Sequence, residues 1–393
     1  MTRHFSFATT LRRTPSAQLH VFFQTLGIDM PISWDKLKSR EIVPIIHCFE
    51  KLPRSSRQQV EGFLREINSL ACQDGLNALR EAAAIEQIGP WETTFKASAT
   101  FHSRAMWFWT EHPRVFEKAL AIQMLNRISW WRRIGGLPRI HPRFTEERKR
   151  ELERKLQSFF RCRQGRGELC TVTCFNRGNG QHYFLCRLDD HVKNLVIHND
   201  GGEAVSRAIC KTFAVAYCYD RNTGTLTLNT QATRVHKPEL ENIFITTVLD
   251  TNSDVLTETP FDLNVIKHPN FTFVTDPIDG VRVELEEVQF LWPGTQAITY
   301  RRLNNADTLT RFRACLNSAE ADPNEAIITR VKLRFYFAGD GKGRESHYTF
   351  EIMAPRTFTI HLGDQRKVEL IHKYLLQWRI DYDVCVNRTP VAA

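Results

Sequence analysis

Apolar residues recur at helical spacing through roughly the first 160 positions of the chain. After Ser56, the residues Val60, Leu64 and Ile67 follow one another at intervals of three and four, which is the period of an amphipathic helix. Ser56 and Gln59 form a capping-box pattern at the start of that segment. The same kind of periodicity predicts a bundle with helices over residues 15–26, 35–51, 56–70, 75–88, 97–111 and 114–133.

A further helical segment follows two interruptions, at Pro138 and Pro142, because a proline disfavours helical backbone at the residue before it. Thr145 can cap this segment, which runs to about Phe160 and places Leu152 on the same face as other apolar residues. The remaining faces are rich in glutamate, arginine and lysine. We therefore predict a charged helix that connects the helical part of the chain to the part that follows.

Beyond residue 167 the period of the apolar residues changes from 3.6 to 2. Cys170, Val172 and Cys174 alternate with threonines, and a segment rich in glycine and asparagine then leads to a second alternating run, as in a β-hairpin. The pattern predicts strands over residues 170–174, 184–188, 212–219, 225–229, 281–292, 326–337 and 348–353, with helices over 238–249 and 365–378. The apolar phase slips at Glu286 and Glu287, which predicts a β-bulge there.

These patterns together predict an α+β multidomain protein. Its N-terminal part, residues 1–143, is expected to be a basic all-α helical bundle, followed by a charged connector helix and loop over residues 144–166. Residues 167–393 form a strand-rich, mainly antiparallel α+β region that can divide into two subdomains, 167–250 and 260–393. A chain of 393 residues exceeds the size at which one hydrophobic core usually stops growing.

The composition is that of a chain that folds by itself. Apolar residues make up 42% and charged residues 25% of the sequence, which is ordinary globular usage. Apolar stretches fall short of the ~18 residues of a membrane span, and the first residues lack a signal-peptide pattern. We therefore expect a cytoplasmic protein, neither secreted nor in a membrane, whose ten cysteines stay reduced.

The net charge of +9 is unevenly distributed along the chain. Residues 1–167 hold 28 lysines and arginines against 16 acidic residues, whereas residues 168–393 hold 25 against 28. Residues 127–166 alone hold 13 basic and 4 acidic residues, a surplus equal to that of the whole chain. One segment therefore sets the electrostatic character of the protein and favours a polyanionic partner.

This basic segment also carries two adjacent tryptophans. Aromatic rings beside guanidinium groups supply stacking surfaces and phosphate donors, the combination used to bind single-stranded DNA and RNA. The candidate nucleic-acid-binding residues are Arg127, Trp130, Trp131, Arg132, Arg133, Arg139, Arg143, Arg148 and Lys149. Alternatively, Trp130 and Trp131 anchor the bundle to the second domain, while the arginines solvate a linker or pair with glutamates of the connector helix.

Four cysteines and a histidine provide ligand types that zinc prefers: Cys162, Cys170, Cys174, Cys186 and His182. If Cys170 and Cys174 share a strand, however, four residues at ~3.3 Å each place them ~13 Å apart, too far for a common zinc ion. The chain also lacks a C-x-x-C pair. We therefore expect these cysteines to be core thiols, and we predict no metal and no cofactor.

Two acidic clusters leave a different chemistry open. Asp189, Asp190 and His191 are expected directly after a strand, and a further group of acids lies between Asp276 and Glu287. Such groups can bind a metal or move a proton in a metal-dependent nuclease or hydrolase. Aspartates are also the residues that turns need for their own backbone. The common phosphate-binding and hydrolase motifs do not occur, so an enzyme is the less favoured interpretation.

A basic stripe in the strand predicted over residues 326–337 allows two interpretations. Arg330, Lys332 and Arg334 share one face of that strand. They can track a phosphate backbone, or they can pair with Arg282, Glu284 and Glu286 of a neighbouring strand as a charge ladder. The ladder is favoured, because this half of the chain has no net positive charge.

The sequence therefore favours a non-enzymatic or accessory protein that binds nucleic acid or a nucleoprotein partner through its basic segment. An arginine-rich chain of this kind fits a bacterial mobile-element or antiviral-defence component, although no motif carries that interpretation. The alternatives are the metal-dependent nuclease or hydrolase and a structural subunit that binds a protein partner.

Overall fold

The computed structural model describes residues 4–38, 40–95, 99–177, 180–199, 201–251, 261–301, 307–319, 321–338, 345–360 and 365–381. Parts of the helix predicted over 97–111 and of the hairpin segment rich in glycine and asparagine, at residues 97–98 and 178–179, lie outside these ranges. The α-helices are α1 (Phe7–Arg13), α2 (Ser16–Thr25), α3 (Val43–Glu50), α4 (Arg54–Leu70), α5 (Gln73–Ile85), α6 (Phe101–Glu111), α7 (Pro113–Asn126), α8 (Glu146–Gln164), α9 (Lys237–Phe244), α10 (Thr308–Ser318) and α11 (Gln365–Gln377). The strands are β1 (Trp131–Ile134), β2 (Cys170–Asn176), β3 (Gln181–His198), β4 (Ala204–Asp220), β5 (Thr225–Asn229), β6 (Val281–Leu291), β7 (Ile298–Arg301), β8 (Ile327–Phe337), β9 (Ser346–Met353) and β10 (Thr357–Phe358).

The chain divides into two compact units. Unit 1 consists of Met1–Arg127 and Val192–Ile209, and unit 2 consists of Ile128–His191 and Cys210–Ala393. Residues 128–143, which the sequence pattern groups with the helical bundle, thus have their contacts in unit 2. The basic segment belongs, apart from Arg127, to the same unit as the strands.

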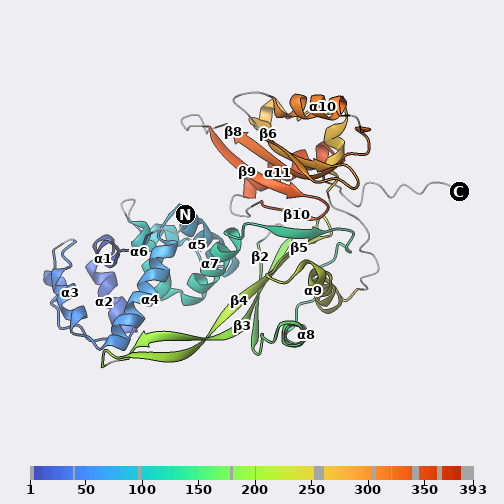
Figure 1. Ribbon diagram of the computed structural model, residues 1–393. Coiled ribbons are helices and arrows are strands. Elements are labelled where there is room, and N and C mark those ends of the chain that lie inside the picture. The colour runs from blue at the N-terminus through green and yellow to red at the C-terminus, as the bar shows by residue number, and fades with distance from the viewer. Residues whose placement is uncertain are drawn as a thin grey trace. The chain divides into compact units, whose positions relative to one another are not determined.

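Unit 1 contains the helices α1–α7 (Figure 1). The periodic apolar face of α4 is buried as predicted, with Val60, Leu64 and Ile67 fully inaccessible to solvent. The predicted capping box, however, is not used. The helix begins at Arg54 behind Pro53, so Ser56 lies within its first turn rather than at the cap position.

Unit 2 is built on a ten-stranded sheet in the order β2-β3-β4-β5-β1-β10-β9-β8-β6-β7. The fold is therefore α+β, as the sequence predicts. One of the differences affects the basic segment: the helix predicted over 114–133 ends at Asn126, and Trp131–Ile134 form β1. This short strand pairs antiparallel with β5 on one side and with β10 on the other, and these two ladders override the local helical pattern.

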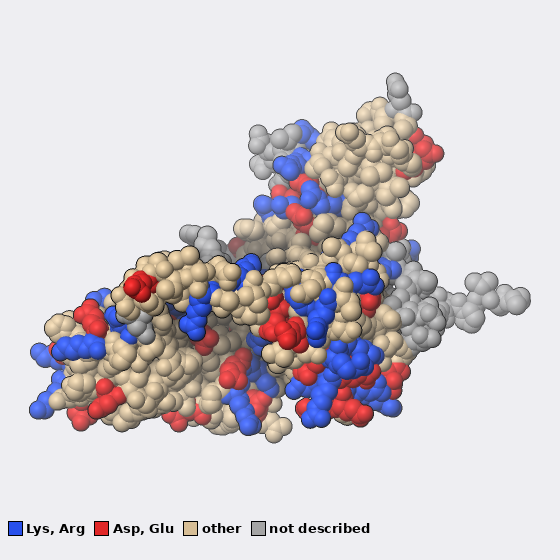
Figure 2. All heavy atoms as spheres, turned by 60° about the horizontal axis from the view of Figure 1, so that its bottom comes forward, with Lys and Arg blue, Asp and Glu red and all other residues tan. Residues whose placement is uncertain are grey.

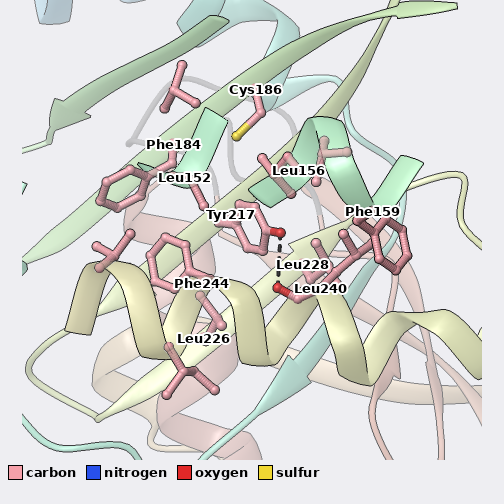
Figure 3. Packing of buried hydrophobic residues seen from close by; sticks show 14 of the residues in the cluster. Leu152, Leu156, Phe159, Phe184, Cys186, Tyr217, Leu226, Leu228, Leu240 and Phe244 are labelled. Atoms are coloured by element: carbon pink, nitrogen blue, oxygen red, sulfur yellow. Dashed lines mark hydrogen bonds between the residues drawn. The ribbon is translucent and has the colours of Figure 1, made fainter. Parts of the chain in front are cut away.

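Helices α8 and α9 pack on one face of the sheet. The core between them contains Leu156 and Phe159 of α8 and Leu240 of α9, together with inward-facing residues of β3, β4 and β5 (Figure 3). The hydroxyl of Tyr217 in β4 donates a hydrogen bond to the Leu240 carbonyl at 3.1 Å, which satisfies a polar atom buried in this core.

The charged helix predicted from Thr145 to about Phe160 is confirmed as α8, and all of it belongs to unit 2. Its Thr145 cap accepts a hydrogen bond from the Arg148 backbone N–H, and Gly165 ends the helix with a φ of 64°. This left-handed backbone is readily adopted by glycine, which has no Cβ to clash. Leu152 is buried as expected, and the opposite face is exposed.

The charge ladder predicted for the second half of the sheet is also confirmed. Within the β6–β8 pair, the register shifts between Leu285 and Glu287, where the sequence predicts a bulge. Glu287 accepts a hydrogen bond from Arg330, and Arg334 lies 3.2 Å from a carboxylate oxygen of Glu286. The basic stripe on β8 therefore pairs with acids of the neighbouring strands.

The strands β3 and β4 are unusually long and form the green arm in Figure 1. Their distal half, Val192–Ile209, makes its contacts with unit 1, where the Arg54 guanidinium donates a hydrogen bond to the Asn199 carbonyl at 2.7 Å. Asp189–His191 therefore lie within a strand, and the sequence prediction that they follow a strand end is wrong. The difference arises because β3 is longer than the local sequence pattern indicates.

Candidate nucleic-acid interface

Two residues at the centre of the basic segment are buried in the sheet. Trp131 is 0% and Arg133 only 6% exposed. The Arg133 guanidinium donates a hydrogen bond to Oδ2 of Asp381, and Nδ1 of His372 lies 3.6 Å from the same oxygen. These side chains hold unit 2 together and have no surface left for a nucleic acid.

The neighbouring residues of the segment are also engaged within unit 2. Arg132 forms a two-pronged ion pair with Glu241, with distances of 2.5 Å from Nε to Oε1 and 3.3 Å from Nη2 to Oε2. Burial raises the pKa of Glu241 even against the opposing effect of Arg132. The Trp130 ring is covered by the Lys237 ammonium at 4.0 Å from its centroid. These contacts all lie within unit 2, so they do not show Trp130 and Trp131 anchoring the bundle. The two arginines pair with Glu241 and Asp381 rather than with glutamates of the predicted connector helix.

Two further candidate residues begin α8 and are paired. Arg148 donates to the Thr247 carbonyl at 3.2 Å and lies 2.8 Å from a carboxylate oxygen of Asp250. Lys149 lies 3.8 Å from Glu146 on its own helix. Their positive charges are thus largely balanced, which reduces the attraction they exert on phosphates.

The remaining candidates, Arg127, Arg139 and Arg143, are exposed. Arg127 ends the first segment of unit 1, so the structure does not place it with the others. The backbone N–H of Arg143 donates to the Val248 carbonyl at 3.3 Å, which holds this residue close to the start of α8. Its guanidinium has no acidic partner within the described ranges.

Helix α8 itself carries a second set of arginines. At 3.6 residues per turn, Arg150, Arg154 and Arg161 lie within about 40° of one another around the helix axis. All three are exposed, opposite the face that buries Leu152 and Leu156. In the part of the chain that the structure describes, none of the three has a carboxylate within ion-pair distance. We call these three residues the α8 arginine stripe.

The flanks of the stripe are charged but paired. Lys155 lies 2.9 Å from Glu151, and Arg163 lies 3.3 Å from Glu239 of α9. Figure 2 turns the lower side of Figure 1, where α8 lies, toward the viewer and shows basic side chains gathered there with acidic ones among them. The stripe is therefore a line of unbalanced positive charge between neutralised neighbours.

Sequence reasoning did not single out Arg154 and Arg161. The signal that identifies them is their spacing from Arg150, four and eleven residues, combined with the apolar residues that fix the buried face of the helix. Eleven residues at 1.5 Å each give the stripe a length of about 16 Å. At 3.4 Å per phosphate along one strand of a duplex, it faces about five phosphates.

Unit 1 carries a separate cationic surface. A cavity of about 600 Å³ is lined by four basic side chains, Arg12, Arg13, Lys38 and Arg40, and one acidic residue, Glu41. Within the described residues, none of the four cations forms an ion pair. This cavity can also attract phosphates, so an experiment on nucleic-acid binding has to separate it from the α8 arginine stripe.

Three of the acids considered for a nuclease site have partners within the structure. Asp190 accepts from Arg166 at 2.7 Å, Asp276 accepts from the Ile278 backbone N–H, and Asp279 accepts from Lys373 at 2.6 Å. Over the described ranges, no group of three or more histidine, cysteine, aspartate or glutamate side chains is placed to hold a metal ion. These residues therefore act as partners of cations or as caps in this structure.

Two of the three cysteines of β2 and β3 lie in the hydrophobic core, and Cys174 packs against it. Cys170 and Cys186 belong to the cluster of buried apolar side chains between the sheet and α8. Cys186 is labelled in Figure 3. Burial, and then the nearby Glu153 carboxylate, raise the pKa of the Cys170 thiol to about 12. A thiol of this kind stays protonated near neutral pH and is a poor metal ligand.

No protein-family model matches the chain, and no curated protein matches it in sequence. Among the described residues, no helix is both long enough and apolar enough to cross a membrane. The fold and the surface of unit 2 therefore carry the functional argument.

Proposed function

We propose that the protein is a non-enzymatic or accessory protein that binds DNA or RNA through the phosphate backbone, with α8 as its contact surface. The supporting observation is the α8 arginine stripe, three exposed guanidinium groups in line without acidic partners. Arginine is well suited to this role, because its planar fork donates two hydrogen bonds to a phosphate. We include Arg143, which precedes the helix, because it is also exposed and has no acidic partner within the described ranges.

The proposal moves the interface from residues 130–133 of the basic segment to α8, which forms the later part of the same segment. Phosphate contacts position a nucleic acid but carry little sequence information, so binding should show little sequence preference. A nucleoprotein partner presents the same phosphates. The link to a bacterial mobile element or to antiviral defence stays a prediction, since no residue described above bears on it.

The test compares two triple variants of α8 by fluorescence anisotropy with labelled single-stranded and duplex oligonucleotides. R150Q/R154Q/R161Q removes the stripe, whereas K149Q/K155Q/R163Q removes three charges that are already paired on the same helix. Counterion release makes each phosphate contact worth about a factor of ten at 0.05 M salt. We expect the first variant to lose up to about 1,000-fold in affinity and the second to lose much less.

Equal losses in the two variants would show that only net charge matters and would refute the stripe as the interface. The variant R12Q/R13Q/K38Q/R40Q neutralises the cationic cavity of unit 1. If this variant abolishes nucleic-acid binding and R150Q/R154Q/R161Q does not, the cavity of unit 1 is the interface. If the unaltered protein binds no nucleic acid at low salt, the structural-subunit alternative gains support.

A further inference from the structure

The cationic cavity of unit 1 brings together basic residues from two segments of the chain. Arg12 and Arg13 belong to the last turn of α1, and Lys38 and Arg40 follow about 25 residues later. All four residues are exposed, so a ligand from solvent can reach their charges. The cavity volume of about 600 Å³ is within the range of small-molecule sites in many proteins.

The backbone that carries Arg12 and Arg13 is held in place on both sides. The hydroxyl of Thr14 is buried and donates a hydrogen bond to the Thr10 carbonyl at 2.9 Å. The hydroxyl of Thr100, which caps α6, donates to the Arg13 carbonyl at 2.5 Å. The two arginines therefore project from a fixed turn, which lowers the cost of ordering them around a ligand.

The charges that line the cavity do not balance. Among the described residues of the lining, Glu41 is the only acid, and it closes a turn. Its Oε2 accepts from the Lys38 backbone N–H at 2.9 Å, and its own N–H donates to the Lys38 carbonyl at 3.0 Å. Four basic residues against this one acid leave a surplus of three positive charges. Cations held around one cavity repel one another, and a bound anion removes that repulsion.

The start of α2 adds to the positive potential of the cavity. Helix α2 begins at Ser16, and Pro15, Ser16 and Leu19 all line the cavity. Within the described part of the chain, no side chain caps this helix, and its first turn contains no acid. The backbone N–H groups of a first helical turn attract phosphates. The helix end therefore reinforces the attraction that the four cations exert.

The size of the charge surplus indicates which anion fits. A terminal phosphate carries a charge of about −1.5 to −2 at neutral pH, and a phosphate linked on both sides carries one negative charge. A diphosphate group therefore carries about three negative charges in a small volume. A nucleic-acid strand has one charge for about every 3.4 Å of its length. A compact diphosphate group thus matches the cavity better than a nucleic-acid backbone does.

The rest of the lining is largely apolar. Leu11, Leu19 and Ile45 are each only 1% exposed, so they form the inner wall of the cavity, whereas the four cations lie at its exposed rim. Phe95 also lines the cavity. This apolar surface is suited to the organic part of a phosphorylated molecule.

We propose that the cationic cavity of unit 1 binds a small molecule that carries a diphosphate group, with that group held by the four cations. The site is in a different unit from α8, and the proposal does not depend on nucleic-acid binding there. A nucleoside diphosphate and inorganic diphosphate both have this chemistry. ADP and inorganic diphosphate are therefore the probes that distinguish the two sources.

The experiment titrates ADP, inorganic diphosphate, AMP and adenosine into the full-length protein by isothermal titration calorimetry at low salt without magnesium. We expect at least one of the two diphosphates to bind with a Kd below about 1 mM. AMP should bind about tenfold more weakly than that diphosphate, because it lacks one phosphate contact. Adenosine, which has no phosphate, should not bind. Tighter binding of ADP than of inorganic diphosphate assigns the cavity to an organic diphosphate, and the reverse assigns it to the inorganic anion.

Two triple variants locate the site. R12Q/R13Q/R40Q removes three cations from the cavity, whereas R150Q/R154Q/R161Q removes three exposed arginines from unit 2 as a matched control. The first variant should weaken diphosphate binding about tenfold or more, since each exposed charge contact is worth up to about fivefold. The second should leave diphosphate binding nearly unchanged. Nucleic-acid binding by α8 should respond to the two variants in the opposite way, so either proposal can fail without the other.

Circular dichroism identifies a variant that fails to fold. If R12Q/R13Q/R40Q does not fold, the single variants Arg12→Gln and Arg40→Gln decide the question, each with an expected loss of about two- to fivefold. The proposal is overturned if neither diphosphate binds in the expected range, or if AMP or adenosine binds as tightly as the diphosphates. Equal losses of diphosphate affinity in the cavity variants and in R150Q/R154Q/R161Q would overturn it as well.

Discussion

Replacement of Arg133 by leucine tests the most deeply buried charge pair of unit 2. Arg133 donates to Asp381, and the side chains are only 8% and 0% exposed. The pair joins β1, at the centre of the sheet, to the residue four positions after α11. Arg133→Leu leaves Asp381 as a buried anion that has lost its strongest partner. The variant should therefore be strongly destabilised.

The size of the effect follows from this burial. Removal of one partner of a buried pair costs about 3–5 kcal/mol. Each kcal/mol lowers Tm by about 2–4 °C in a unit of 150–250 residues, so a decrease of about 6–20 °C is expected. The matched control is Arg163→Leu, because Arg163 and Glu239 are 50% and 44% exposed. The loss of that surface pair should cost less than about 1 kcal/mol.

The pH dependence provides a second readout. In the unaltered protein the pKa of Asp381 is lowered, so its contribution to stability is present above the unfolded value of about 3.9 and is lost below the folded value. Without Arg133, burial raises this pKa instead. The variant therefore becomes more stable, relative to its own value at neutral pH, as the carboxyl is protonated toward pH 4.

Urea unfolding followed by circular dichroism at pH 7 and at pH 4 measures both effects. The difference in unfolding free energy between the unaltered protein and Arg133→Leu should be large at pH 7 and smaller at pH 4. If Arg133→Leu is no less stable than Arg163→Leu at pH 7, the buried pair does not exist and β1 is misplaced.

Two further predictions concern other parts of the chain. Arg54→Ala should increase backbone hydrogen exchange over Val192–Ile209, because it removes a hydrogen bond of about 1–3 kcal/mol at the tip of the arm; unchanged exchange would show that other contacts hold the tip. In native protein, a maleimide reagent should label the exposed thiols of Cys162 and Cys210 within minutes, whereas Cys170 should react only after unfolding, as read by mass spectrometry of peptides. Rapid labelling of Cys170 would contradict its place in the core.

Local patterns were sufficient to predict much of the fold. The α8 helix follows from Thr145 and the apolar spacing, both of which act within the helix, although the helix ends at Gln164 rather than at about Phe160. The bulge between Leu285 and Glu287 follows from one slip of a period-two pattern. Each of these features depends on neighbours in sequence, which is why a single sequence reveals it.

The strand β1 could not be predicted in this way. Trp131–Ile134 follow a strongly helical segment, and their pairing partners in β5 and β10 lie about 95 and 225 residues further along the chain. The partner of Arg133 lies 248 residues away. Long-range pairing of this kind overrides local propensity and leaves no periodic signal in a segment of four residues.

The residues of the proposed interface could not be predicted from the sequence. The basic segment was recognisable from composition, yet the arginines that remain unpaired depend on distant acids. Arg132 and Arg148 are paired with Glu241 and Asp250, about 100 residues away. Only after these partners are known does the α8 arginine stripe stand apart from the rest of the positive charge.

The most direct test of the proposed function is the salt dependence of nucleic-acid binding. Four contacts, by Arg143 and the three arginines of the stripe, predict that log K falls with log salt with a slope of about −3. R150Q/R154Q/R161Q retains one of these contacts and should show a slope of about −1 on every sequence tested. A slope that is the same in this variant and in the unaltered protein would contradict the assignment of the interface to α8.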